Sequence, residues 1–587
     1  MKIISLNRLS SKYIFASVTL VIIMLLIYGM SDGNNTHSKF NSVKSKALKN
    51  AKANMNAVAS EENEYMTQSQ AHLLKQRQKE EQLLAGINMK KDTPAVQTWR
   101  DSEHTLQYRV VHLDLKGAPP RVSYFEDLFP FLKLHGANGI LMEYEDMFPY
   151  SGPYFENVSA YNAYSIPDIK RILSLAKENQ IEVIPLIQTF GHLEFFLKLK
   201  QNIDMREVFS NVGSLCPTHN RTMKVLHAMI DQIVHWHPNL KYLHIGSDEV
   251  YELGKCVRCM DKMKQETWNR GQLFINHVKS VAKYIRTKHS HVMPLVWEDM
   301  FRSLSYTELF ESGISQWVEP VVWNYHPNIL MHINSDIWSM YSHNFKNIWI
   351  ASAFKGATGP DQLLTNFTYH LENHMSWMAI VEQFKHQVNF RGIMMTGWQR
   401  YDHFSVLCEL FPVGIPSLIL NLYYIQNYKH TYPVDAPSKL LDLLRCDVSF
   451  PPHIGGTTCV FPGAPVFILV QRFFLIQREL ENPITGINNP VARAWMSDQN
   501  IKWNVSNPHQ VEAATSEIDR FKMELMNLKT EFRNAALEVY DQYTIEEWIE
   551  AYIRPYEKRL VNQWMAREKL LQRMDWPRRP FNFYRNR

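Results

Sequence analysis

Two adjacent carboxylic acids, Asp248 and Glu249, stand in the motif HIGSDEV at residues 244–250, where a short apolar segment ends. Cleavage of a glycosidic bond needs an acid that protonates the departing oxygen and a negative group that stabilises the developing positive charge on the sugar. Two carboxyl groups held in different environments can supply both. We therefore take Asp248 and Glu249 as the candidate catalytic pair.

Eight short apolar segments alternate with helical patterns through the middle of the chain, and the carboxyl pair ends the fourth of them. Their residues are 109–115, 138–146, 181–192, 241–249, 292–300, 320–325, 347–356 and 392–403. The clearest helical stretches between them are 165–179, 222–235, 269–288 and 365–383. This alternation is typical of the α/β class, and eight units over roughly 300 residues favour a closed (β/α)8 TIM barrel. A doubly wound open sheet is the alternative, but no glycine-rich phosphate fingerprint follows the first strand.

Aromatic residues end three more of the predicted strands. Trp297 ends the fifth strand, Trp323 and Tyr325 the sixth, and Trp398 the eighth. A barrel brings the carboxyl ends of all its strands to one rim, where the active site lies. We therefore expect these rings to wall a pocket beside the carboxyl pair and to bind substrate. There, a tyrosine hydroxyl can also bond an amide oxygen of a sugar.

The composition sets the scale and excludes one class of partner. The 587 residues are 45% hydrophobic, enough for a large core, and 63 Lys and Arg stand against 58 Asp and Glu. A net charge of +5 is slight for this length and is not gathered into a basic face. We expect no nucleic-acid partner and one catalytic domain with appendages.

Residues 13–31 predict a membrane helix. They contain no charged residue and are mostly apolar, close to the roughly 20 residues of a bilayer span. Lys2, Arg8 and Lys12 precede them, and such a positive flank stays in the cytosol. We predict a single-pass type II signal anchor with the catalytic domain lumenal, in the Golgi or another secretory compartment. A cleaved signal peptide is the alternative, because Gly29 and Ser31 are spaced like a cleavage site.

Five N-x-S/T sequons support a lumenal location and predict a glycoprotein. They begin at Asn34, Asn157, Asn220, Asn366 and Asn504.

Changes in composition and in the hydrophobic pattern along the chain predict five segments. They are a cytosolic tail (1–12), the anchor (13–31), a polar stem (32–104), the catalytic domain (105–432) and a mainly helical C-terminal region (433–587). In the last segment Trp548, Tyr552, Tyr556 and Trp564 recur at helical spacing, which we interpret as a packing stripe rather than a sugar platform.

The six cysteines are few, as in a domain held by its core. We favour a bridge between Cys446 and Cys459. Cys256 and Cys259 form a C-x-x-C, but no second such motif and no close histidine pair completes a zinc ligand set. We interpret them as a local disulfide or free thiols and expect neither a metal ion nor a cofactor.

HIGSDEV resembles the H-x-G-x-D-E motif of the glycoside hydrolase family 20 β-N-acetylhexosaminidases, and the resemblance spans about residues 107–425. Further matching blocks are HLDLKGAPP, GANGILMEYEDMFPY, IPLIQTFGHLEF, AFKGATGP and GWQRYDHFSVLCELFP. The resemblance implies a retaining exo-hydrolase that removes terminal N-acetylgalactosamine or N-acetylglucosamine from glycoconjugates. In such an enzyme the substrate's own acetamido oxygen attacks the anomeric carbon, Glu249 is the general acid/base and Asp248 orients the acetamido group.

The resemblance also implies roles for residues around the pair. His192, in TFGH after the third strand, matches the family's Gly-His motif and supports the carboxyls. Trp297 and Trp398 match tryptophans that wall the family's sugar pocket.

Two departures from the family pattern stand out. Ser247 replaces the glycine that commonly precedes the Asp-Glu pair, and no arginine ends strand one to grip the sugar's terminal hydroxyls. Asp114 and Lys116 stand there instead, and Glu143 and Glu145 follow strand two. Glu143 and Glu145 are candidates for those hydroxyls, and we take Asp114 and Glu143 as substrate-binding residues.

Two other classes of protein share this layout. An anchor and stem also precede many Golgi glycosyltransferases, although no D-x-D motif for a nucleotide-bound cation occurs. A catalytically inactive sugar-binding or scaffolding protein is the third hypothesis, against which the intact pair argues. The oligomeric state is left open, with a homodimer among the alternatives.

Overall fold

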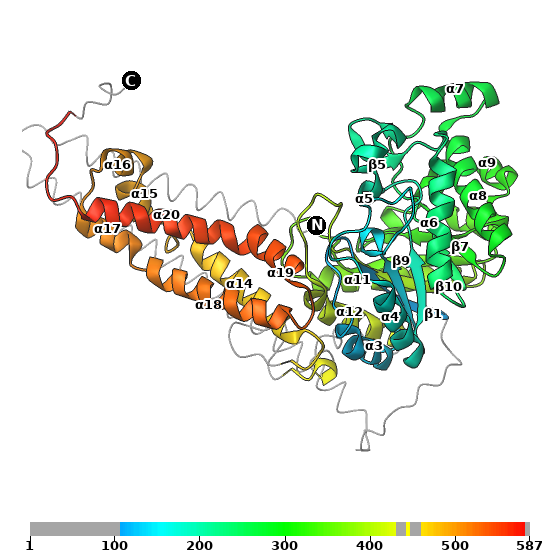
Figure 1. The fold of residues 1–587 in the computed structure, drawn as a ribbon. Helices are drawn as coiled ribbons and strands as arrows, with labels where there is room; N and C mark the ends of the chain where they lie inside the picture. Colours follow the sequence, from blue (N-terminus) through cyan, green and yellow to red (C-terminus); the bar gives the residue numbers. More distant parts are fainter. Residues whose placement is uncertain (1–105, 430–441, 447–458, 581–587) are drawn as a thin grey trace, which may run out of the picture. The chain divides into compact units, whose positions relative to one another are not determined.

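The computed structural model describes residues 106–429, 442–446 and 459–580 (Figure 1). The described residues all fall within one compact unit. The predicted tail, anchor and stem lie outside the described residues, as do all four predicted segment boundaries. Within the described ranges, no helix is both long enough and apolar enough to span a bilayer.

Eight parallel strands close into a barrel, so the (β/α)8 prediction is confirmed and the open sheet is wrong. Around the barrel the order is β1-β10-β9-β8-β7-β6-β3-β2. Each predicted segment supplies one strand: β1 Tyr108–Asp114, β2 Gly139–Glu143, β3 Glu182–Leu186, β6 Tyr242–His244, β7 Met293–Trp297, β8 Glu319–Trp323, β9 Ile348–Lys355 and β10 Phe390–Gly397. The register pairs Asp114 with Glu143, which puts these two residues side by side at the carboxyl ends of β1 and β2.

Helices lie between the successive strands and after the last one. They are α3 Tyr124–Leu134, α4 Ile166–Glu178, α5 Glu194–Leu197, α6 Thr222–Trp236, α7 Val257–Glu266, α8 Arg270–Lys288, α9 Tyr306–Ser312, α10 Asp336–Asn344, α11 Phe367–Phe384 and α12 Phe411–Asn427. The four predicted helices are α4, α6, α8 and α11. In α4, Ser165 and Asp168 form a reciprocal capping box, and a buried stripe including Ile169 and Ile172 faces the core.

A small antiparallel hairpin interrupts the barrel between β3 and β6. Its strands are β4 Arg206–Val208 and β5 Asn211–Leu215. The backbone N–H of Leu193 donates to the carbonyl of Gly213 (3.0 Å), and that of Leu215 donates to the carbonyl of Phe190 (3.0 Å). The hairpin therefore holds the loop that follows β3.

The C-terminal region is helical, as predicted. Its helices are α14 Ala464–Glu481, α15 Pro490–Trp495, α16 Asp498–Trp503, α17 Pro508–Thr515, α18 Ile518–Ala536, α19 Gln542–Trp548, a π-helical turn Ile549–Ile553 and α20 Arg554–Leu571. Trp548 stacks on Phe532 with ring centroids 4.2 Å apart, and both Trp548 and Tyr556 are buried. The packing interpretation of the aromatic stripe holds for these two residues.

This region contacts the barrel directly. Pro120, after β1, forms an isolated bridge with Tyr540, and the hydroxyl of Tyr552 donates to the carbonyl of Leu407 (2.6 Å), after β10. Both barrel partners follow the carboxyl end of a strand, so helical residues lie close to the rim that carries the candidate site.

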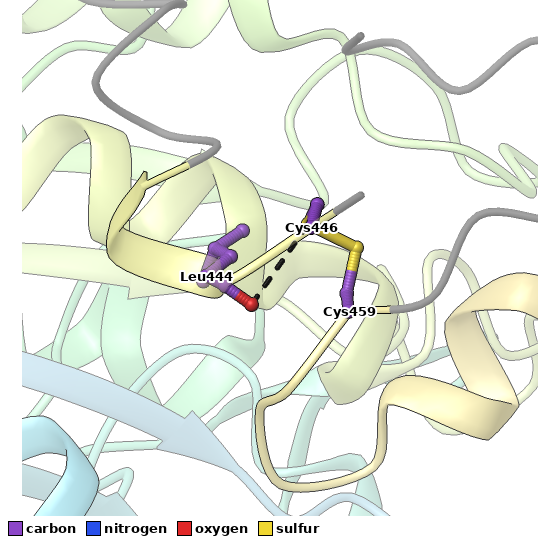
Figure 2. Close-up of a disulfide and its surroundings, with 3 residues drawn as sticks. All are labelled: Leu444, Cys446 and Cys459. Atoms are coloured by element: carbon purple, nitrogen blue, oxygen red, sulfur yellow. Dashed lines mark hydrogen bonds between the residues drawn. A yellow bond between two sulfur atoms is a disulfide. The ribbon is translucent and has the colours of Figure 1, made fainter. Parts of the chain in front are cut away.

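The six cysteines form one disulfide and four free thiols. Cys446 and Cys459 form the predicted disulfide, beside the carbonyl of Leu444 (Figure 2). Cys256 and Cys259 are free thiols, one of the two states expected for them, and Cys216 and Cys408 are free as well.

Candidate active site

A pocket of about 250 Å³ opens at the carboxyl ends of the barrel strands. It is lined by Lys116, Glu143, Gln188, His192, Asp248, Glu249, Trp297, Trp323, Tyr325, Gly356, Ala357, Trp398, Arg400 and Tyr401. Every site residue expected from the sequence is among them except Asp114 and Glu145. The barrel thus brings together residues from the ends of all eight strands.

The backbone around the carboxyl pair is sharply turned. β6 ends at His244, and Gly246, Ser247 and Glu249 adopt left-handed conformations with φ of 61°, 75° and 49°. Such backbone is costly for residues with a Cβ and clusters at functional sites. Ser247, where a glycine is usual, is stabilised there because its N–H donates to Oε1 of Gln188 (3.2 Å).

Gln188 also holds Asp248. Its Nε2 donates to Oδ1 of Asp248 (3.2 Å), and the Asp248 side chain is almost fully buried. Burial raises the pKa of Asp248, and the negative charges of Glu249 and Glu143 raise it further, against the opposing effect of His192.

His192 joins the two carboxyls. Its Nε2 lies 3.2 Å from Oε2 of Glu249 and 3.6 Å from Oδ2 of Asp248. The preceding Gly191 allows this approach, because a Cβ there would collide with the backbone carbonyl of Asp248. Burial disfavours protonation of His192, but Asp248, Glu249 and Glu194 outweigh it and raise the pKa to about 10. A protonated His192 therefore supports the pair.

Glu249 is the more exposed member of the pair. Its backbone N–H donates to Oδ2 of Asp299 (3.0 Å), and the hydroxyl of Tyr251 donates to its Oε1 (3.0 Å). The hydrogen bond from His192 lowers the pKa of Glu249. The two adjacent carboxyls thus have pKa values displaced in opposite directions.

Four aromatic rings form the wall. Trp297 and Trp398 lie with centroids 6.3 Å apart, Trp323 and Tyr325 5.1 Å, and Tyr325 and Trp398 6.4 Å. The indole N–H of Trp323 donates to Oδ1 of Asp299 (3.1 Å). Asp299 therefore ties the aromatic wall to Glu249. Burial, with repulsion from Asp248, raises the pKa of Asp299 to about 7.

Asp114 and Glu143, the two acidic residues taken as substrate-binding, are engaged with protein groups. Asp114 does not line the pocket: it accepts from the backbone N–H of Gln399 (2.7 Å) and lies 3.2 Å from Nζ of Lys116. Glu143 does line the pocket, but its oxygens contact Nε2 of His112 (2.8 Å) and Nζ of Lys116 (3.3 Å). Asp114 is thus not among the residues that line the pocket, and its role in binding substrate stays a prediction.

Arg400 is a pocket residue that sequence reasoning missed. Its Nε donates to the carbonyl of Lys116 (2.8 Å), and its two Nη groups donate to the carboxylate of Glu547 (2.7 and 3.0 Å). Arg400 follows β10 and Glu547 lies on α19, so the helical region braces a wall of the pocket.

Gln188 and Asp299 were missed as well. Each follows the end of a barrel strand, β3 and β7, and a polar residue in that position was the signal that could have found them.

Comparison with known proteins agrees with this geometry. Residues 127–401 match the family model described as the glycosyl hydrolase family 20 catalytic domain. The human protein named hexosaminidase D is 39% identical over 456 residues, which cover 77% of this chain and 93% of the human protein. Bovine hexosaminidase D is 46% identical over 315 residues, 54% of this chain and 90% of the bovine protein.

Among solved structures, the β-N-acetylhexosaminidase from Bacteroides fragilis NCTC 9343 superposes with a TM-score of 0.42 at 18% sequence identity. The matched region covers 55% of this chain and 65% of the bacterial one.

Proposed function

This chain belongs to glycosyl hydrolase family 20 and is a β-N-acetylhexosaminidase, and we propose that it removes single terminal N-acetylhexosamine residues by substrate-assisted catalysis at Asp248 and Glu249. The observation that carries the proposal is the shared contact of His192 with both carboxyls inside a pocket walled by four aromatic rings. Two adjacent acids whose pKa values are displaced in opposite directions suit two different tasks.

In the first step, the acetamido oxygen of the substrate bonds to the anomeric carbon as the glycosidic bond breaks. Glu249 gives its proton to the departing oxygen, and Asp248 accepts a hydrogen bond from the acetamido N–H, which offsets the positive charge of the oxazolinium intermediate. In the second step, Glu249 takes a proton from water, and the water oxygen bonds to the anomeric carbon as the bond between that carbon and the acetamido oxygen breaks, which restores the neutral acetamido group. Two inversions leave its configuration retained.

Substrate binding must first change which of the two carboxyls carries a proton. In the structure His192 favours the ionised form of Glu249, whereas the acid needs to be protonated. A sugar covering Glu249 removes water and raises its pKa, and the acetamido N–H stabilises an ionised Asp248. Binding therefore promotes the protonation states that the first step requires.

Exo-action fits the size of the pocket. Its volume of about 250 Å³ lies below the roughly 300–1,000 Å³ of sites that hold drug-sized ligands. A single sugar ring is the occupant that such a volume favours. We keep both N-acetylgalactosamine and N-acetylglucosamine as terminal sugars of the glycoconjugate substrates.

Paired assays test the activity and the mechanism. The protein should hydrolyse a chromogenic N-acetylgalactosaminide, an N-acetylglucosaminide or both, with the β-anomer as the first product seen by NMR. A thiazoline that mimics the oxazoline should inhibit it. Release of the α-anomer first would overturn the substrate-assisted route, as would indifference to the thiazoline.

We further propose that a type II signal anchor at residues 13–31 places the enzyme in the lumen of the Golgi or another secretory compartment. The uncharged run and its basic flank support this topology. Three sequon asparagines of the described chain, Asn157, Asn220 and Asn366, are exposed. Protease treatment of microsomes should leave the catalytic domain intact, and carbonate extraction should leave it in the membrane fraction. Extraction into the supernatant would instead favour the cleaved signal peptide.

A further inference from the structure

Four potential metal ligands converge outside the pocket. They are Glu207 on β4, Cys216 directly after β5, and Cys256 and Cys259 at the start of α7. Figure 1 labels β5 and α7. One ligand atom from each lies within 4.8 Å of all the others. The C-x-x-C motif supplies two of the four ligands that a zinc site needs. Glu207 and Cys216, 40 or more positions before Cys256, supply the other two.

The distances suit a tetrahedral thiolate site. Sγ of Cys216 lies 3.4 Å from Sγ of Cys256 and 3.7 Å from Sγ of Cys259. Zinc–sulfur bonds of about 2.3 Å in a tetrahedron put neighbouring sulfurs about 3.8 Å apart. A disulfide would require about 2.05 Å. The remaining ligand is also close, because Oε2 of Glu207 lies 3.1 Å from Sγ of Cys259.

Surrounding groups hold these ligands in place. The other oxygen of Glu207 accepts from the backbone N–H groups of Lys255 (2.6 Å) and Cys256 (3.0 Å). The backbone N–H of Cys259 donates to Sγ of Cys256 (3.3 Å), which caps α7. Glu207, Cys216 and Cys259 are buried, and hydrogen bonds from backbone and neighbouring groups are what orient the ligands of metal sites.

We propose that Glu207, Cys216, Cys256 and Cys259 form a structural zinc site. Three thiolates and one carboxylate select a soft divalent ion with tetrahedral geometry, and four protein ligands leave no open position for catalysis. Zinc would displace the protons of the three thiols, which pass to solvent, and no electron is transferred.

The site would brace the loop that carries the catalytic pair and the loop that carries His192. Cys216 follows the β4–β5 hairpin, which hydrogen-bonds to Phe190 and Leu193 on either side of His192. Cys256 and Cys259 end the loop that leaves Glu249. Zinc would therefore cross-link the His192 loop to the Glu249 loop at a distance from the substrate.

Metal content and thiol count test the proposal on the full chain, produced in a secretory host and purified in detergent without chelator. We expect about one zinc ion per chain by mass spectrometry. Denaturation without reductant should release four free thiols, the number outside the disulfide. Zinc-free protein with two thiols missing would mean a bridge among these cysteines, and zinc-free protein with four thiols would mean an empty thiol cluster. Either result would overturn the proposal.

Variants locate the ion. Glu207→Gln keeps an oxygen for the two backbone donors, and it should weaken zinc affinity by at least the roughly 10- to 100-fold that loss of an outer partner costs. Cys408→Ser, which removes a buried thiol outside the cluster, should leave the zinc content unchanged. Cobalt exchanged into wild type should give thiolate charge-transfer absorption, which Cys216→Ser should weaken. A cobalt-loaded protein without such absorption would contradict thiolate ligation, even if a cysteine variant failed to fold.

The readouts are independent of turnover. A protein that binds zinc but hydrolyses no N-acetylhexosaminide would leave the metal site standing and overturn the proposed function. An active enzyme without zinc would leave the proposed function standing and overturn the metal site.

Discussion

Glu547, on α19 of the helical region, accepts two hydrogen bonds of 2.7 and 3.0 Å from the guanidinium of Arg400. Arg400 lines the substrate pocket and its Nε also holds the carbonyl of Lys116. The Arg400 side chain is only 7% exposed, whereas that of Glu547 is 42% exposed. The C-terminal helices are therefore part of the architecture of the site rather than a separate appendage.

Glu547→Gln should impair substrate use more than stability. The amide cannot pair two oxygens with the guanidinium, so Arg400 is released at the pocket wall. We expect kcat/KM to fall roughly 5- to 10-fold, which corresponds to about 1 to 1.4 kcal/mol and is modest because Glu547 is partly exposed. Steady-state kinetics with a chromogenic substrate measure the change.

Glu546→Gln is the matched control. Glu546 lies on the same helix and pairs in the same two-bond manner with Arg533, at 2.6 and 2.8 Å, but it does not line the pocket. Both variants should lower the thermal midpoint by similar amounts, and only Glu547→Gln should lower kcat/KM. Equal kinetic losses in the two variants would mean that the Arg400 contact serves stability alone.

The barrel was predictable because its signal is local. Each strand is an apolar run of a few residues, and each intervening helix carries its own hydrophobic period. The position of Asp248 and Glu249 in the pocket was predictable for the same reason, since both residues follow a strand and the barrel rule places such residues at the site.

Residues whose role depends on tertiary contacts were not predictable in this way. Asp114 ends β1, yet its carboxylate pairs with Lys116 and does not line the pocket. Glu547 reaches Arg400 across 147 residues, and Glu207 reaches Cys259 across 52. No spacing rule relates such pairs, because the packing of separate elements brings them together.

Replacement of His192 should move the pH profile. The hydrogen bond from His192 lowers the pKa of Glu249, and free enzyme is competent only while Glu249 is protonated. His192→Phe removes the donor, so the pKa of Glu249 rises and the basic limb of kcat/KM moves to higher pH. The rate at the optimum should fall, because the pair loses its support.

Tyr251→Phe provides a graded comparison. The Tyr251 hydroxyl is a weaker influence that lowers the pKa of Glu249 in the same sense. Its loss should shift the basic limb in the same direction by less than His192→Phe does. Profiles of kcat/KM against pH for the three proteins measure both shifts, and a limb that stays in place or moves to lower pH would refute the assigned contact.

Glycan occupancy should follow the exposure of the sequon asparagines. Asn157, Asn220 and Asn366 are exposed, whereas Asn504 is half-buried and ends α16 with a left-handed backbone. A glycan is bulky and hydrated, so the folded chain accommodates it at the first three positions better than at the fourth. Glycopeptide mass spectrometry of protein from a secretory host should find the first three modified and Asn504 mostly free. Unmodified asparagines throughout would contradict the lumenal location.

The division of labour between Asp248 and Glu249 gives the sharpest test of mechanism. Glu249→Gln cannot donate a proton, so hydrolysis of unactivated glycosides should fall by roughly 10²- to 10⁴-fold, the scale of one acid/base group. A substrate with a good leaving group needs no such proton in the bond-cleaving step. It should therefore still give a rapid first step, followed by slow breakdown of the intermediate because water lacks its base.

Asp248→Asn should behave differently, because Asp248 acts on the acetamido group and not on the leaving group. Its loss should depress hydrolysis of activated and unactivated substrates alike, and the thiazoline inhibitor should bind this variant poorly while it binds wild type well. Pre-steady-state kinetics and inhibitor titration separate the two patterns. If both variants kept near-normal turnover of an unactivated N-acetylhexosaminide, neither carboxyl would hold its proposed role. If Asp248→Asn recovered with a better leaving group as Glu249→Gln does, the two assignments would have to be exchanged, because leaving-group dependence identifies the acid irrespective of which carboxyl His192 contacts more closely.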